Sequence, residues 1–109
     1  MSQAHCEIDV GGVRLPARAA LVAAIEDAWA RLAGAGTWWS GAERLAIVAA
    51  ARKAVGCGLC RQRKAALSPY TIAGVHDGAS VLPTEAIEVV HRLRTDAGRI
   101  SEAWVRRMV

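Results

Sequence analysis

The sequence predicts an all-α protein, and two properties of the chain carry that prediction. The 109 residues contain no Phe and are rich in alanine, the residue with the strongest helix preference. Apolar residues recur every three or four positions along much of the chain, as in amphipathic helices, and no strand is predicted. The expected organisation is a flexible arm over residues 1–14 and a single helical domain over residues 15–109. Because a domain of this size has a thin core, we also expect it to oligomerise.

Each expected helix is bounded by residues that start or stop helices. Gly34 and Gly36 follow the first helix, because glycine tolerates the left-handed conformation that ends one. Ser40 and Glu43 form a capping-box pattern at the start of the second. Residues 45–51 are apolar on every side, so we expect this second helix to be buried at the centre of the fold. The expected helices cover residues 15–33, 42–55, 57–67, 70–75, 83–95 and 100–109.

Charge and hydropathy narrow the classes of partner. The formal net charge is +4, and the basic residues are scattered among acidic ones, which predicts a solvated basic face and no nucleic-acid partner. The longest apolar run, residues 45–51, is too short to cross a bilayer, and residues 1–10 do not resemble a signal peptide. We therefore expect a cytoplasmic protein without a membrane partner. In the cytoplasm, a Cys-X-X-Cys pair is more often catalytic or metal-binding than structural.

The Cys-X-X-Cys pair, Cys57 and Cys60, stands where the third helix is expected to begin. Free N–H groups at a helix start lower the pKa of a thiol, and so do nearby cations such as Arg52. Two thiols at this spacing close readily into a disulfide and can cycle between dithiol and disulfide. The sequence therefore favours a redox site without a cofactor.

A redox pair also needs a group that moves protons. His91 is the first candidate, because it lies on an amphipathic helix and histidine titrates near neutral pH. Asp96 could orient His91 or cap the last helix. Glu43 is a weaker candidate, since a continuous helix would place it about 21 Å from Cys57. The expected catalytic residues are Cys57, Cys60 and His91, with Arg52, Glu43 and Asp96 in support.

Zinc is the alternative use of the same thiols. A structural zinc site needs two further ligands, and the candidates are His76 and His91, although the spacing matches no compact zinc finger. Cys6 beside His5 is a further candidate, but both lie in the expected arm. The alternative function is therefore a non-enzymatic helical assembly or metal-binding module with Cys and His ligands.

The segment GTWWSGAERLAIVAAARKAVGCGLC, followed by RQRKAALSP and later by HRLRTDAGRISEAW, resembles the alkylhydroperoxidase-related group of the AhpD-like (carboxymuconolactone decarboxylase-like) superfamily. Some members of that group carry selenocysteine at the thiol motif. The resemblance runs from residue 15 to the end and corresponds to the N-terminal portion of longer chains. It implies an AhpD-like helical bundle, a central helical hairpin carrying the thiols, and a homo-oligomer.

The same resemblance implies a function. The expected activity is reduction of a peroxide or exchange of a disulfide, with a protein or small dithiol as the reductant. Two positions depart from the family's pattern: Lys64 stands where the family has a histidine, and Leu45 stands where it has a glutamate. Only Cys57 and Cys60 therefore carry over directly.

Overall fold

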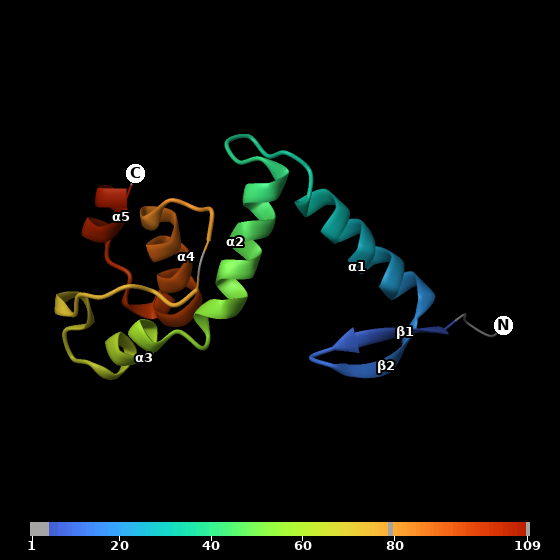
Figure 1. The fold of residues 1–109 in the computed structure, drawn as a ribbon, viewed down its shortest axis with the longest axis horizontal. Helices are drawn as coiled ribbons and strands as arrows, with labels where there is room; N and C mark the ends of the chain where they lie inside the picture. The colour runs from blue at the N-terminus through green and yellow to red at the C-terminus, as the bar shows by residue number, and fades with distance from the viewer. Residues whose placement is uncertain (1–4, 79, 109) are drawn as a thin grey trace.

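The computed structural model describes residues 5–78 and 80–108, which form an N-terminal arm and a larger helical body (Figure 1). The arm consists of β1 (His5–Val10), β2 (Val13–Arg18) and α1 (Ala19–Leu32). The body consists of α2 (Gly41–Ala54), α3 (Gly58–Ala65), the 3₁₀ turn η1 (Pro69–Thr71), α4 (Thr84–Asp96), the 3₁₀ turn η2 (Ala97–Arg99) and α5 (Glu102–Met108). Of the all-α prediction, the mostly helical character of the chain is confirmed.

A two-stranded antiparallel hairpin replaces the start of the predicted first helix. Gly11 and Gly12 connect the strands with φ values of 62° and 86°, as the two-residue type I′ turn requires. The prediction of no strand is therefore wrong, and so is a helix beginning at residue 15. The sequence carried a signal for the hairpin, because apolar residues alternate on both sides of the two glycines. They face one another across the strands as Cys6↔Ala17, Ile8↔Leu15 and Val10↔Val13.

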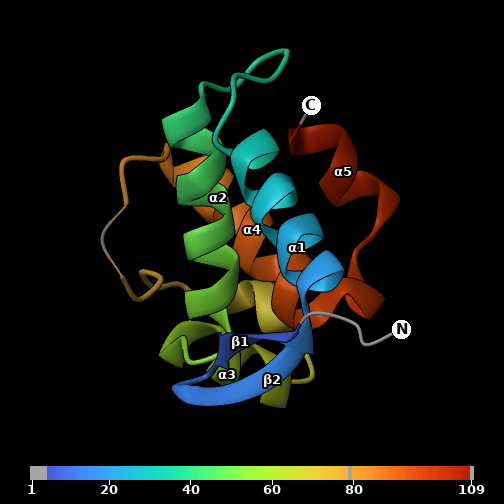
Figure 2. The same ribbon diagram turned by 90° about the vertical axis from the view of Figure 1, so that its right-hand side faces the viewer.

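The body is built around α2 and α4, which pack side by side (Figures 1 and 2). The third helix, α3, packs on α4 and η1 instead of folding back along α2, so α4 is the helix that pairs with α2. The helix expected over residues 70–75 is only the short turn η1. Central burial of residues 45–51 is not found either: in α2, whose residues are all described, only Ala50 and Ala54 are buried.

The core of the body is small and has thiols and an imidazole at its centre. Among the described residues, the largest fully buried side chains are those of Cys57 and His91. Leu59 and Ile72 pack against the two cysteines. In the described part of the chain, the buried apolar residues are Ala50, Ala54, Cys57, Leu59, Cys60, Pro69, Leu82 and Trp104. The cluster around the cysteines lies where the start of α3 meets the segment after η1, while Ala50 and Ala54 belong to α2 and Trp104 to α5.

The predicted capping box at the start of α2 is present. The Ser40 hydroxyl accepts a hydrogen bond from the Glu43 N–H at 3.1 Å, and the Glu43 carboxylate accepts one from the Ser40 N–H at 2.9 Å. Replacing Ser40 by Ala should lower the free energy of unfolding by about 1 kcal/mol, because a helix N–H loses its partner. Urea unfolding followed by circular dichroism measures this change. Ser68→Ala is the control, since Ser68 is exposed and its side chain caps no helix; an equal loss there would contradict the capping role.

Candidate metal centre

Cys57 and Cys60 lie at the junction between α2 and α3. The chain leaves α2 through a turn in which the Gly56 N–H donates to the Lys53 carbonyl at 3.1 Å and the Cys57 N–H donates to the Ala54 carbonyl at 3.1 Å. Cys57 then adopts an extended conformation as the N-cap of α3. Because Cys60 sits in the first turn of that helix, the two thiols are brought together at its N-terminus. Both are buried, with exposed fractions of 1% and 6%.

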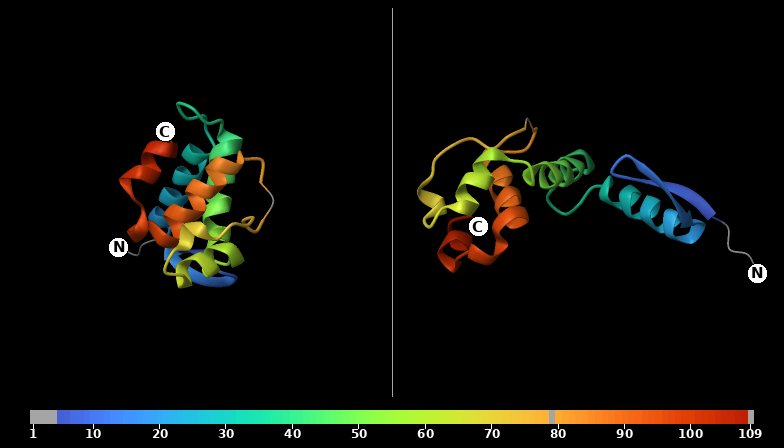
Figure 3. Two further views of the ribbon diagram at one scale, coloured as in Figure 1. Left: turned by 90° about the vertical axis from the view of Figure 1, so that its left-hand side faces the viewer. Right: turned by 90° about the horizontal axis from the view of Figure 1, so that it is seen from below.

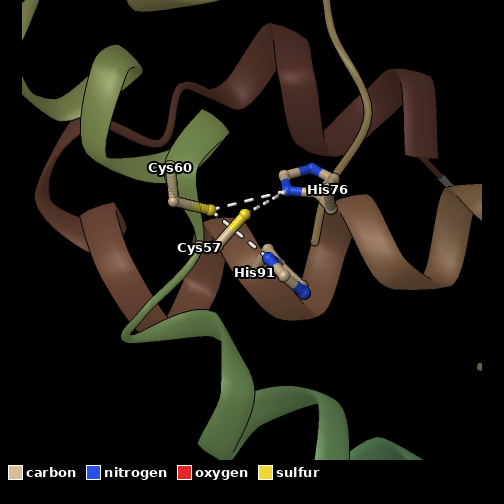
Figure 4. Close-up of side chains that lie close together, drawn as sticks. All are labelled: Cys57, Cys60, His76 and His91. Atoms are coloured by element: carbon tan, nitrogen blue, oxygen red, sulfur yellow. Dashed lines mark hydrogen bonds between the residues drawn. The ribbon is translucent and has the colours of Figure 1, made fainter. Parts of the chain in front are cut away.

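Two histidines from distant parts of the chain complete the cluster (Figure 4). His91 projects from α4, and its Nδ1 lies 3.3 Å from the Sγ of Cys60. His76 lies on the irregular segment that follows η1, and its Nδ1 is 3.5 Å from the Sγ of Cys60 and 3.6 Å from the Sγ of Cys57. The two imidazole rings stand with their centroids 4.2 Å apart. Three separate segments therefore meet at the two sulfurs.

The spacing of these four atoms suits a tetrahedral metal ion. One ligand atom from each of Cys57, Cys60, His76 and His91 lies within 4.8 Å of all the others. Zinc bonds of about 2.3 Å to sulfur and 2.0–2.1 Å to nitrogen place tetrahedral S and N ligands about 3.6 Å apart. The three measured S–N distances, 3.3, 3.5 and 3.6 Å, lie close to this value.

The outer nitrogen of His76 is held by a carboxylate. His76 Nε2 donates to Glu88 on α4, and Glu88 also accepts from Arg63 Nη1 at 2.7 and 3.0 Å. The Nε and Nη2 of Arg63 donate to the Ile72 carbonyl at 3.1 and 3.0 Å. A proton fixed on Nε2 leaves the lone pair of Nδ1 directed at the thiols. Metal-binding histidines are commonly oriented by a carboxylate in this way.

Asp77 supports the thiol side of the cluster. Its backbone N–H donates to the Cys57 Sγ at 3.3 Å, and its carboxylate accepts from the Gly58 N–H at 2.8 Å. The first contact stabilises negative charge on the sulfur. The second places a carboxylate at the N-terminus of α3, where the helix dipole favours it. Asp77 thereby fixes the segment that carries His76 against the first turn of α3.

The two thiols differ in acidity. Burial alone would raise the pKa of Cys57, but the backbone N–H groups of Cys60 and Asp77 and the contact with His76 lower it to about 7. Burial raises the pKa of Cys60 to about 11, and the neighbouring Cys57 sulfur acts in the same direction. Burial lowers the pKa of His91, and its proximity to His76 lowers it further. At neutral pH the cluster therefore offers a neutral imidazole and a readily formed thiolate, the forms in which these side chains bind metals.

The carboxylate of Glu88 is partly buried and stays ionised. Burial would raise its pKa, but the hydrogen bond from His76 and the positive charge of Arg63 lower the pKa below its ordinary value. An ionised Glu88 can only accept hydrogen bonds. The proton between Glu88 and His76 is thus held on the imidazole.

The supporting residues expected from the sequence lie elsewhere. Glu43 is engaged in the capping box at the opposite end of α2. Arg52 is exposed in the last turn of α2. Asp96 accepts from Arg99 Nε at 2.7 Å, and Arg99 donates in turn to carbonyl groups at the end of α3. Cys6 is exposed on β1. Of the expected catalytic set, the structure brings Cys57, Cys60 and His91 together.

Sequence analysis missed the residues that orient the ligands: Arg63, Asp77 and Glu88. Two weak signals were present. Glu88 precedes His91 by three residues, so the two share one face of α4, and Asp77 directly follows His76. Neither signal identifies the partner, because Glu88 binds the other histidine, His76.

Comparison of the chain with protein-family models, with curated proteins and with solved structures found no match. Within residues 5–78 and 80–108, none of the helices combines the length and the apolar character that crossing a membrane requires.

The Glu88 contact gives a test of how the cluster is oriented. Glu88→Gln should weaken zinc binding by roughly 10- to 100-fold, because removing the carboxylate that holds a ligating histidine has an effect of this size. Competition with a chromophoric zinc chelator measures the affinity. Glu85→Gln on the exposed first turn of α4 is the matched control and should bind zinc as the parent does. Unchanged affinity in Glu88→Gln would show that His76 is not held for metal binding.

Proposed function

We propose that this chain is a helical metal-binding module in which Cys57, Cys60, His76 and His91 hold one zinc ion. The observation that carries the proposal is the convergence of four ligand atoms within 4.8 Å of one another. Cys57 and His91 are each 1% exposed, so the centre of the cluster is screened from solvent. Four protein ligands in a closed site are typical of structural zinc, whereas catalytic zinc keeps a position for water.

The ligand set supports zinc among the common metals. Two thiolates and two imidazoles at tetrahedral spacing suit zinc, whereas magnesium and calcium take oxygen ligands. Both histidines offer Nδ1. The thiolate form of Cys57 is favoured by the N–H groups that point at it, and a bound cation would favour the thiolate of Cys60 as well.

The role of the ion would be to fasten the body together. It would join the start of α3, the irregular segment carrying His76, and α4, which come from separate parts of the chain. Apolar burial in the body is slight, and small domains with thin cores commonly rely on metals or disulfides. Because the unfolded chain has no preformed site, the free energy of metal binding stabilises the fold.

The proposal predicts one zinc per chain and a fold that depends on it. Elemental analysis of protein purified without added chelator should give about one zinc per chain. Cys60→Ser and His76→Ala should each lose the ion and lower Tm by more than about 10 °C, since a structural zinc contributes several kcal/mol. Cys6→Ser is the matched control, because Cys6 is exposed and lies outside the cluster. Metal-free protein whose Tm does not respond to added zinc would refute the structural role.

A second function, dithiol redox chemistry, is favoured by a different observation. Cys60 borders a cavity of about 200 Å³ whose other lining side chains include Arg61, Lys64 and Arg94. The cavity gives a route from the surface to Cys60. The pKa of Cys57 near 7 also suits a nucleophile. This function is the one that the AhpD-like resemblance implies.

In that chemistry one thiolate attacks the O–O bond of a peroxide. It becomes a sulfenic acid while the alcohol or water leaves, and the second thiol displaces water to form the Cys57–Cys60 disulfide. The net change is ROOH plus dithiol giving ROH, water and disulfide, and an external protein or small dithiol returns the pair to the thiols. His91, at 3.3 Å from the Cys60 Sγ, is placed to accept the thiol proton.

Thiol titration separates the two functions. If the metal is structural, zinc-loaded protein treated with a stoichiometric alkyl hydroperoxide should keep both cluster thiols and its zinc, because the ion masks the sulfurs. Under the redox function, metal-free protein should lose two thiols per peroxide consumed and regain them with a dithiol. Cys57→Ser and Cys60→Ser should each abolish that cycle, while Cys6→Ser should retain it. Rapid disulfide formation together with absence of zinc after purification would favour the redox function over the metal.

A further inference from the structure

The chain exposes more surface than a compact monomer of its mass. Its accessible surface is 7954 Å², whereas a folded monomer of 11.5 kDa exposes about 5,800 Å². Its radius of gyration is 17.6 Å, against about 13 Å for a compact domain of this length. Figure 3 shows the cause, because the arm extends away from the body. About 2,100 Å² of surface per chain is therefore left for another molecule to cover.

The arm presents an apolar helix face that the hairpin and α2 cover only in part. None of the α1 residues, all of which the structure describes, is buried. Leu21 and Trp29 are 51% and 42% exposed, although both belong to the apolar stripe that repeats along one side of the helix. The stripe consists of Leu21, Val22, Ile25, Trp29 and Leu32.

The body presents a matching groove. A cavity of about 410 Å³ lies between α2 and α4, close to the end of α5. It is mostly apolar, and its walls include Trp39, Ile47, Pro83, Ala86, Val89 and Met108. Ile47 of α2 and Val89 of α4 both line this cavity, so an apolar helix laid in it would contact both helices.

The connection between α1 and α2 keeps the arm away from its own body. Arg44 Nη1 donates to the Gly34 carbonyl at 2.8 Å, and the Gly36 N–H donates to the Trp39 carbonyl at 2.8 Å. Gly41 approaches the Ala33 carbonyl so closely that a Cβ would clash with it. The arm is thus held in its projecting direction by specific contacts, which favours an occupant of the groove from a second chain.

We propose that two copies of this chain form a symmetric dimer by exchanging arms, with the α1 stripe of each copy seated in the α2–α4 groove of the other. The contact is reciprocal, as two-fold symmetry requires. The excess surface of about 2,100 Å² per copy exceeds the roughly 800 Å² per partner of a standard interface and matches a permanent dimer.

Sedimentation velocity on the full-length protein at micromolar concentration tests the exchange. The parent chain should sediment with twice the chain mass. Trp29→Glu in the stripe and Val89→Glu in the groove should each give monomers. Each variant buries a charge on one side of the proposed apolar contact. Ala30→Glu, on the opposite face of α1, is the matched control and should stay dimeric. Helical circular dichroism should remain for every variant, which separates loss of association from loss of folding.

Mixing the two monomeric variants identifies which surfaces meet. The Val89→Glu chain keeps an unaltered arm, and the Trp29→Glu chain keeps an unaltered groove. A mixed pair therefore contains one intact contact between arm and groove, and dimers should reappear. A monomeric parent chain would overturn the proposal. A dimeric Val89→Glu would also overturn it, because the arms would then pair with each other and leave the groove empty. Failure of the mixture to associate, while both variants stay folded, would exclude arm exchange.

Discussion

The body of this protein depends on the meeting of three chain segments at two buried sulfurs. Cys57 and Cys60 come from the start of α3, His76 from a segment without regular structure, and His91 from α4. The segment carrying His76 is irregular, and it is anchored by the contacts of Asp77 with Cys57 and Gly58 and by the contact of His76 with Glu88. Leu59 and Ile72 pack around the same sulfurs. The Cys and His cluster is therefore part of the apolar core, and a metal ion bound by the cluster would also stabilise the core.

Several arginines of this basic chain serve its own backbone. Arg63 joins α3 to the Ile72 carbonyl and to Glu88, and Arg99 donates to three carbonyl groups at the end of α3 while pairing with Asp96. Arg92 is buried with its guanidinium over the rings of Tyr70 and Trp104. The guanidinium fork can satisfy several acceptors at once, which suits the irregular segments of a small body. The net charge of +4 is in part a consequence of this internal use.

Local sequence signals predicted what is local in the fold. The positions of α2 and α4 follow from apolar spacing and from the Ser40–Glu43 cap, and each begins within one residue of its predicted start. The hairpin was not predicted from the sequence. The alternation of apolar residues around Gly11 and Gly12 is a short signal, and the alanine-rich sequence that follows it favours a helix. The ligand cluster is harder to predict, since Cys60 lies 16 residues from His76 and 31 from His91. Their meeting depends on how α3 turns away from α2, and no local pattern encodes that turn.

The unusual apolarity of α2 links the single chain to its proposed assembly. A helix that is apolar on every side is expected to be buried on every side, yet within one chain α4 covers only part of it and Leu45 stays exposed. An apolar residue can be buried by its own chain or by a second chain, and the sequence alone does not distinguish the two. If a second copy lays its α1 in the groove, it covers the side of α2 that carries Ile47, whereas Leu45, two residues away, faces the other side. The expectation of central burial is therefore wrong for the single chain, and the proposed dimer would account for one side of α2 only.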